Sequence, residues 1–201
     1  MPAPPFSMSP AQLKLRDDYL QSSTGYDERF PTIVQTRTNL PRFKAGMVTP
    51  PAVLDLPCAW GHSTEALRRL GFKPSGLDES VVAIQKAKAV HKFCQFYWGS
   101  PYNPGVLKNA VFDAIVAHDF QLYNSPYDAG TLQGTLQLMK YLRKGGLFVL
   151  LLHTNKSCLK KWDAWGNTYF QDPEDIARLF AQLGGSSSYA HGTIVGEAYK
   201  K

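Results

Sequence analysis

Short apolar runs alternate with amphipathic stretches along most of the chain, and this alternation is typical of α/β proteins. The runs are short enough to be buried strands, whereas the stretches between them have helical spacing. The expected strands are Ala52–Leu56, a weak one near Ser75–Leu77, Phe93–Trp98, Phe112–Ala117, Leu147–Leu152 and Thr193–Tyr199.

Helices are expected where start and stop signals agree with the apolar spacing. The hydroxyl of Ser80 can accept a hydrogen bond from the first turn of a helix that follows it. The clearest helix begins after Asp172, with a proline and acidic residues in its first turn, and stops at Gly184. The four expected helices span about residues 63–71, 80–90, 130–142 and 172–184.

The two ends of the chain differ from this middle part. Residues 1–50 are proline-rich and lack sustained periodicity, so we expect them to cover a core formed by residues 51–201. Only 17 residues follow Gly184. They can form a shortened antiparallel hairpin or a single edge strand, and we favour the hairpin.

Composition narrows the class of protein. The chain has 201 residues, 44% of them hydrophobic, which fits one domain with a substantial core. No apolar run is long enough to span a membrane, and the first residues lack the pattern of a secretory signal, so we expect a cytoplasmic protein. Cys58, Cys94 and Cys158 lack the spacing of a disulfide framework or a zinc site. We interpret Cys58 as a packing residue.

Charge is spread evenly. The net charge of +6 divides into +2 for residues 1–52, +3 for residues 53–155 and +1 for residues 156–201. Clustered lysine and arginine would indicate nucleic-acid binding, and no such cluster is present. A nucleic-acid partner is therefore disfavoured.

The segment Val53–Thr64 carries the strongest indication of function. Its expected strand is followed by a loop of small residues, and a helix is expected to begin directly after this loop. In open parallel sheets, ligands bind beyond the carboxyl ends of strands, next to free helix N-termini. Asp78 ends the next strand 23 positions after Asp55, where an acid suits the hydroxyls of a ribose. The alternative is that Asp78 only caps the helix starting near Val81.

Four segments together resemble the class I S-adenosylmethionine-dependent methyltransferases over about residues 50–185. They are Val53–Gly61, which follows the first motif of that family, Gly76–Ser80, Phe112–Val116 and Leu142–Val149. The resemblance implies a three-layer, doubly wound and mostly parallel sheet. It also implies S-adenosylmethionine as cofactor and S-adenosylhomocysteine as product, with no metal.

The resemblance also implies roles for single residues. Asp55 and Gly61 would neighbour the methionine part of the cofactor, although Asp55 can alternatively accept N–H groups of its own turn. Asp78 would bind the ribose. The chain departs from the family pattern at three positions of this site: Pro57 and Ala59 replace glycines, and Ser100 replaces an acid. The full set of expected cofactor-binding residues is Asp55, Pro57, Ala59, Gly61, Asp78, Glu79, Gly99, Ser100 and His118.

The end of the fourth strand borders the transferred methyl group in this family. His118 is a candidate general base there, and Asp119 can orient or charge it. Because neighbours in an extended strand point to opposite faces, we expect at most one of them to face the acceptor. Methyl transfer without a side-chain base is the alternative.

Aromatic residues are candidates for binding the acceptor. They are Tyr26, Phe120, Tyr123, Trp162 and Trp165. The last two can instead cover the end of the sheet. Arg29 or Arg37 can pair with the cofactor carboxylate or can be ordinary exposed charges.

The expected function is transfer of a methyl group to an oxygen, nitrogen or sulfur atom of a small molecule. One alternative is a non-catalytic cofactor-binding or partner protein with a degenerate site. The other is an RNA or protein methyltransferase. The sequence leaves the oligomeric state open.

Overall fold

The computed structural model describes residues 10–11, 14, 28–107, 109–154, 159–160 and 169–201. In chain order the main elements are α2 (Phe30–Arg37), α3 (Leu40–Ala45), β1 (Ala52–Leu56), α4 (His62–Arg69), β2 (Lys73–Asp78), α5 (Val81–Val90), β3 (Gln95–Trp98), α6 (Pro104–Leu107), β4 (Phe112–His118), the 3₁₀ turn η1 (Gln121–Tyr123), α7 (Ala129–Met139), β5 (Leu142–His153), α8 (Pro173–Gln182), β6 (Ser186–Ala190) and β7 (Thr193–Tyr199). None of the described helices is long and apolar enough to cross a membrane.

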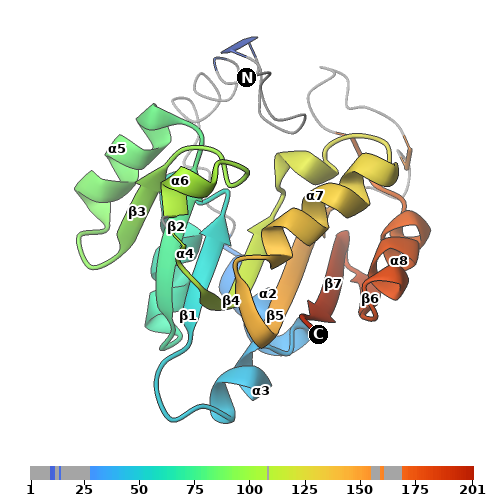
Figure 1. The fold of residues 1–201 in the computed structure, drawn as a ribbon, viewed down its shortest axis with the longest axis horizontal. Coiled ribbons are helices and arrows are strands. Elements are labelled where there is room, and N and C mark those ends of the chain that lie inside the picture. Colours follow the sequence, from blue (N-terminus) through green and yellow to red (C-terminus); the bar gives the residue numbers. More distant parts are fainter. Residues whose placement is uncertain (1–9, 12–13, 15–27, 108, 155–158, 161–168) are drawn as a thin grey trace.

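Seven strands form one sheet in the order β3-β2-β1-β4-β5-β7-β6 (Figure 1). The first five strands pair in parallel, and β7 runs antiparallel to both β5 and β6. The direction of strand order changes between β1 and β4. In doubly wound sheets, such a switch point is where ligands bind, beyond the carboxyl ends of the strands.

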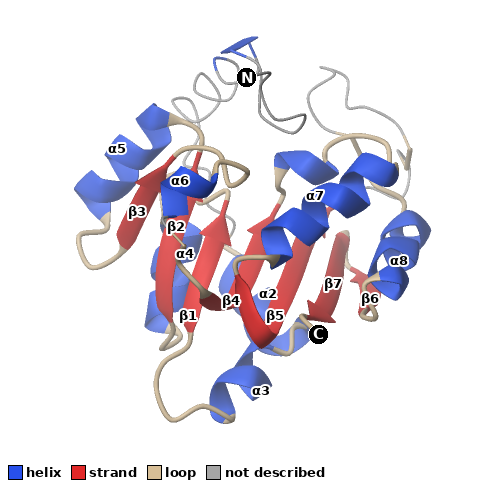
Figure 2. Cartoon of the chain, in the orientation of Figure 1, coloured by secondary structure: helices blue, strands red, loops and turns tan. Residues whose placement is uncertain are grey.

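Helices lie on both faces of the sheet (Figure 2), and alternate residues of a strand are buried under different helices. Val53 belongs to a buried cluster with residues of α2, α3 and α4, whereas Leu54 belongs to a cluster with residues of α7 and α8. The period of two along a strand produces this division. Helices therefore cover both faces, and the predicted three-layer α/β fold is confirmed.

Several element boundaries follow the predicted signals. The strands Ala52–Leu56 and Thr193–Tyr199 have the predicted limits. The hydroxyl of Ser80 accepts from the N–H of Ala83 at 3.0 Å and caps α5 as expected. The third helix, however, ends at Met139, and β5 begins at Leu142 rather than Leu147, because Leu142 already pairs with Phe112 in β4.

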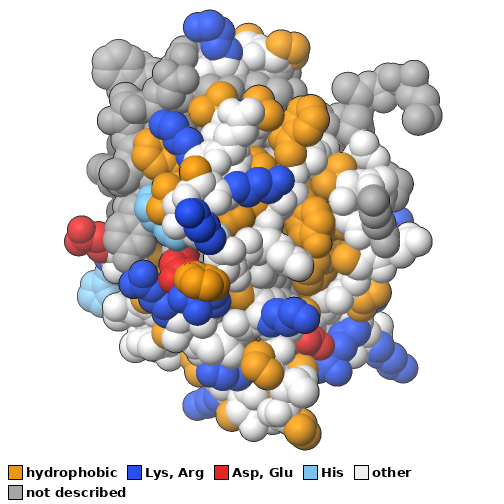
Figure 3. All heavy atoms as spheres, turned by 90° about the vertical axis from the view of Figure 1, so that its left-hand side faces the viewer, with side chains coloured by type: hydrophobic (Ala, Val, Ile, Leu, Met, Phe, Trp, Pro, Cys, Tyr) orange, Lys and Arg blue, Asp and Glu red, His pale blue; other side chains and the backbone are white. Residues whose placement is uncertain are grey.

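The β3 edge of the sheet is short, and Figure 3 shows basic side chains lying among hydrophobic ones on this side of the molecule. Two exposed aromatic side chains lie here, Phe93 at 87% and Trp98 at 61%. The guanidinium of Arg68 covers the Phe93 ring at 5.6 Å. Short edges flanked by charge resist pairing with other chains.

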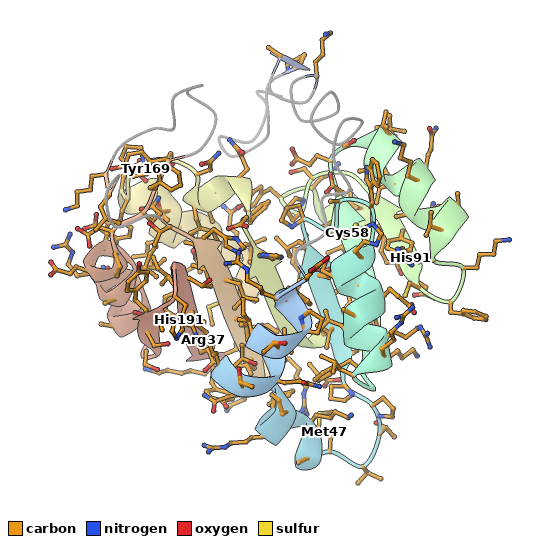
Figure 4. The ribbon with its side chains drawn as sticks, turned by 180° about the vertical axis from the view of Figure 1, so that it is seen from behind. Arg37, Met47, Cys58, His91, Tyr169 and His191 are labelled. Carbon is orange, nitrogen blue, oxygen red and sulfur yellow. The ribbon has the colours of Figure 1, made fainter. Side chains whose placement is uncertain are left out.

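The opposite edge is the predicted C-terminal hairpin. Its turn is His191–Gly192, both with positive φ (50° and 73°), as in the tight turns that match strand twist. Arg37 lies beside this turn (Figure 4) and donates to the carbonyl oxygens of Ala190 and Thr193 at 2.9 and 3.0 Å. The guanidinium of Arg37 thus ties α2 to the hairpin and is not an ordinary exposed charge, whereas its pairing with the cofactor carboxylate stays an untested alternative.

Candidate functional site

The loop after β1 is fixed to the end of β2 by one carboxylate. Asp78 accepts from the backbone N–H of Ala59 through Oδ2 and from that of Ser80 through Oδ1, each at 2.9 Å. Asp78 is buried. It thus ties the β1 loop to the segment that leads into α5, besides any role toward a ribose.

Two residues of this loop have left-handed backbone. Ala59 has φ +46° and Gly61 has φ +81°. Glycine adopts this conformation freely, whereas a Cβ atom makes it costly. Ala59 therefore adopts the positive φ for which the family pattern has a glycine, and its methyl group lies in the loop that is expected to approach the cofactor.

Gly61 also provides space for a ring of the β3 strand. A Cβ atom on Gly61 would lie 2.6 Å from Cζ of Phe96, and one on Gly76 would lie 2.6 Å from Cδ1 of the same ring. Phe96 is buried with Cys58, Ile84 and Ala87, which agrees with the interpretation of Cys58 as a packing residue. The two glycines thus allow the β1 loop to pack closely against β3.

Asp55 is a fully buried carboxyl at the end of β1. Its Oδ2 accepts from the hydroxyls of Ser63 at 2.7 Å and Thr64 at 2.5 Å. Burial raises the pKa of Asp55 to about 7, against the opposing effect of these two hydrogen bonds. Among the described residues, none hydrogen bonds to its other oxygen, Oδ1, although that atom is buried.

This raised pKa predicts a pH-dependent stability. The folded protein holds a proton on Asp55 up to about pH 7, whereas the unfolded chain loses it near pH 4, so stability from this group falls as pH rises through 7. Between about pH 5.5 and about pH 8.5 the loss amounts to about 2 kcal/mol. We expect Asp55→Asn to remove this pH dependence. The free energy of unfolding of the variant, measured in urea, should therefore rise relative to that of the wild type when the pH is raised from about 5.5 to about 8.5. An equal difference at both pH values would contradict this assignment.

The ends of β2 and β3 pack against each other next to the loop. The indole N–H of Trp98 donates to the carbonyl of Glu79 at 2.9 Å, and the N–H of Gly99 donates to the carbonyl of Asp78 at 2.9 Å. The hydroxyl of Ser100 faces the N–H of Tyr102 at 3.4 Å. The structure thus places Glu79, Gly99 and Ser100 beside Asp78, and their contact with adenine remains a prediction.

Two histidines and an aspartate meet where β4 and β5 end. The Nδ1 atom of His153 lies 2.5 Å from Oδ2 of Asp119, and Nε2 of His118 lies 3.5 Å from the same oxygen. The other oxygen of Asp119 accepts the backbone N–H of His153 at 2.8 Å. The ring of His118 also contacts that of Phe30 in α2, with centroids 5.1 Å apart.

This cluster corrects one expectation. Adjacent strand residues were expected to point to opposite faces, yet His118 and Asp119 converge. The reason is the backbone of Asp119, which has φ +48° and therefore no longer continues the strand. Both candidate catalytic residues thus lie in one cluster.

The carboxylate of Asp119 is partly exposed to solvent. Its side chain is 47% exposed. Desolvation acts to raise its pKa, but the charges of His118 and His153 and the hydrogen bonds from His153 outweigh it and hold the pKa below the ordinary value. The group is therefore an anion that a small solute can reach.

Of the aromatic residues expected to bind the acceptor, the two that the structure describes are less accessible to it than the cluster around Asp119. Phe120 and Tyr123 are buried in the core, and the hydroxyl of Tyr123 lies 2.9 Å from that of Thr135. Their side chains pack in this structure, so contact with an acceptor remains a prediction. Tyr26, Trp162 and Trp165 lie outside the described residues.

Sequence reasoning missed four residues of the site. His153 ends the β5 strand as His118 ends β4, and equivalent positions on neighbouring strands were a usable signal. Ser63 and Thr64 open the helix next to Asp55, and hydroxyls there suit a buried acid. Nothing in the sequence pairs Phe30 with His118, because α2 reaches that ring only through tertiary packing.

The strand order, the glycine-containing β1 loop and the acid after β2 define the fold of the class I S-adenosylmethionine-dependent methyltransferases. No protein-family model and no curated protein matches the chain. Solved structures do match it over nearly its full length. Their identity to this chain is low, so the likeness shows the fold.

Three of these structures are methyltransferases or are bound to the cofactor or its product. The complex of DhpI with S-adenosylhomocysteine has 19% identity and a TM-score of 0.62, covering 94% of this chain and 97% of that one. Magnesium protoporphyrin IX methyltransferase from Synechocystis, with bound S-adenosylmethionine, has 14% identity and a TM-score of 0.62, covering 97% and 100%. The plantazolicin methyltransferase BpumL, with a desmethyl substrate analogue and S-adenosylhomocysteine, has 13% identity and a TM-score of 0.67, covering 96% and 92%.

Proposed function

We propose that this protein is an S-adenosylmethionine-dependent methyltransferase that acts on a small molecule in the cytoplasm. The observation that carries the proposal is the buried Asp55, whose Oδ1 has no partner among the described residues, at the head of the loop where this fold binds its cofactor. A buried carboxyl oxygen, protonated or not, is costly to leave without a hydrogen-bond donor. The ammonium group of a bound methionine moiety supplies such a donor.

The remaining cofactor-binding roles follow from the same placement. Asp78 would bind the ribose, with Glu79, Gly99 and Ser100 beside the adenine. Ser100 offers a neutral hydroxyl where an acid would give a stronger hydrogen bond. The residues of the β1 loop, Pro57, Ala59 and Gly61, would lie along the methionine part, and His118 would lie near the sulfonium end.

The bound cofactor supplies an activated methyl group, so the protein mainly has to align the acceptor with it. His118 and Asp119 are proposed to contact the acceptor, because they lie at the end of β4, which pairs with the strand before the cofactor loop. Five aromatic residues are also proposed to contact the acceptor: Tyr26, Phe120, Tyr123, Trp162 and Trp165.

A small acceptor is favoured because basic residues are spread evenly along the sequence rather than gathered in one segment, as they often are in polyanion-binding proteins. The solved methyltransferases with this fold act on varied molecules: one is named for magnesium protoporphyrin IX and another is a glycopeptide N-methyltransferase. An RNA or protein acceptor is the second outcome that the following test separates.

The test is transfer of label from methyl-labelled S-adenosylmethionine into separate cellular fractions. We expect label in the low-molecular-mass fraction, and much less label there with Asp78→Asn as the control when the cofactor concentration is below saturation. Label only in RNA or protein would overturn the small-molecule proposal. No transfer to any fraction, together with no cofactor binding, would favour the non-catalytic alternative.

A further inference from the structure

The cluster of His118, Asp119 and His153 contains one ligand atom on each side chain, and these atoms all lie within 4.8 Å of one another. We infer that this cluster binds a divalent transition-metal ion through two imidazole nitrogens and one carboxylate oxygen. The ion-binding claim stands on this geometry alone and does not need the proposed function.

The backbone orients the three ligands in advance. Asp119 lies in the left-handed region, which aspartate tolerates better than most residues, and this backbone lets its side chain converge with that of His118. Its Oδ1 is fixed by the backbone N–H of His153, which leaves Oδ2 directed at the two imidazoles. The ligands come from the ends of two paired strands, β4 and β5, which is a rigid support.

The three ligand atoms already lie near the separation that one ion requires. The 2.5 Å contact from His153 to Asp119 is a strong hydrogen bond, but the 3.5 Å contact from His118 lies beyond the usual range of one. Ligands bound to one ion by bonds of about 2.0–2.2 Å lie roughly 3 Å from each other. Small side-chain adjustments bring all three atoms to that separation, so the cluster can hold one shared ion.

The donor set indicates the class of ion. Imidazole nitrogens suit zinc, iron, nickel and copper, whereas magnesium and calcium prefer oxygen ligands. Three protein ligands leave at least one coordination position open, as in catalytic zinc sites. With Asp119 47% exposed, both an ion and a small molecule can reach the site.

One consequence rests on the proposed function. The cluster lies at the strand ends where the acceptor is proposed to bind, so an oxygen or nitrogen atom of the acceptor would fill the open position. The site would then favour acceptors that carry such a metal-binding atom close to the methylated one.

The experiment is calorimetric titration of the untagged protein with Zn²⁺ after treatment with EDTA. We expect one ion per chain with a micromolar or lower dissociation constant, and no binding of Mg²⁺. Asp119→Asn and His153→Gln should each weaken Zn²⁺ binding about tenfold or more. Asparagine tolerates the left-handed backbone, so Asp119→Asn should fold. His191→Asn at the hairpin turn is the matched control and should bind Zn²⁺ like the wild type.

Two results would overturn the inference. One is absence of stoichiometric Zn²⁺ binding. The other is unchanged binding when Asp119→Asn and His153→Gln are combined, which would place the ion elsewhere, for example at the His62–His91 ring pair. Circular dichroism shows whether each variant is folded. If Asp119→Asn or His153→Gln does not fold, His118→Gln is used in its place. Parallel titration with S-adenosylhomocysteine separates the metal-binding claim from the proposed function. Zn²⁺ binding without cofactor binding would contradict only the proposed function, and cofactor binding without Zn²⁺ binding would contradict only the metal-binding claim.

Discussion

Replacing Gly61 with alanine is expected to lower the free energy of unfolding by about 3 kcal/mol, since left-handed strain and overpacking each cost about 1–3 kcal/mol. The backbone there has φ +81°, and the new methyl group would lie 2.6 Å from Cζ of Phe96. Phe96 is buried and cannot move away without disturbing the packing of α5 on β3. The measurement is urea unfolding followed by circular dichroism.

Gly145→Ala is the matched control for this prediction. Gly145 also has positive φ (+73°), but a Cβ atom there meets nothing within 4 Å. It should therefore cost only the conformational part, about 1 kcal/mol. Equal losses in the two variants would show that the contact with Phe96 contributes nothing.

Asp78→Asn is expected to lower stability by about 2 kcal/mol and to weaken S-adenosylhomocysteine binding about tenfold or more. Each oxygen of Asp78 accepts one backbone N–H, from Ala59 or Ser80. An amide can accept only at one position and turns its own NH₂ toward the other donor. The β1 loop would then lose an anchor, and the proposed ribose contact would lose its charge.

The control is Asp128→Asn in the cap of α7. Asp128 accepts from the N–H of Thr131 at 2.9 Å, and asparagine caps helices about as well as aspartate. That variant should keep both stability and affinity. If Asp78→Asn keeps the wild-type affinity while losing stability, Asp78 only anchors the loop, and the ribose assignment is wrong.

The sequence was sufficient for elements whose signals are local. The β1 strand is apolar apart from Asp55, and α8 begins with a proline directly after Asp172, whose side chain caps it. The weaker β6 strand includes a serine run that no hydrophobic period marks, and it exists because β7 supplies its hydrogen-bond partners. The period of two failed at Asp119, because a single left-handed residue ends the strand there.

The site was predictable to the extent that its residues follow strand ends. The loop after β1 and the acid that ends β2 lie side by side, as the parallel sheet requires. The partnership of His153 with Asp119 depends on the paired ends of β4 and β5, and neither residue marks the other in the sequence. The buried state of Asp55, which raises its pKa, likewise arises only when the sheet and its helices are assembled.

The central claim is that this site binds S-adenosylmethionine. Calorimetric titration of the wild-type protein with S-adenosylhomocysteine tests it most directly. We predict one molecule bound per chain at micromolar affinity, with a rise in melting temperature as ligand is added. No heat of binding and no thermal stabilisation at millimolar ligand would contradict the claim, and the fold would then serve a function other than methyl transfer.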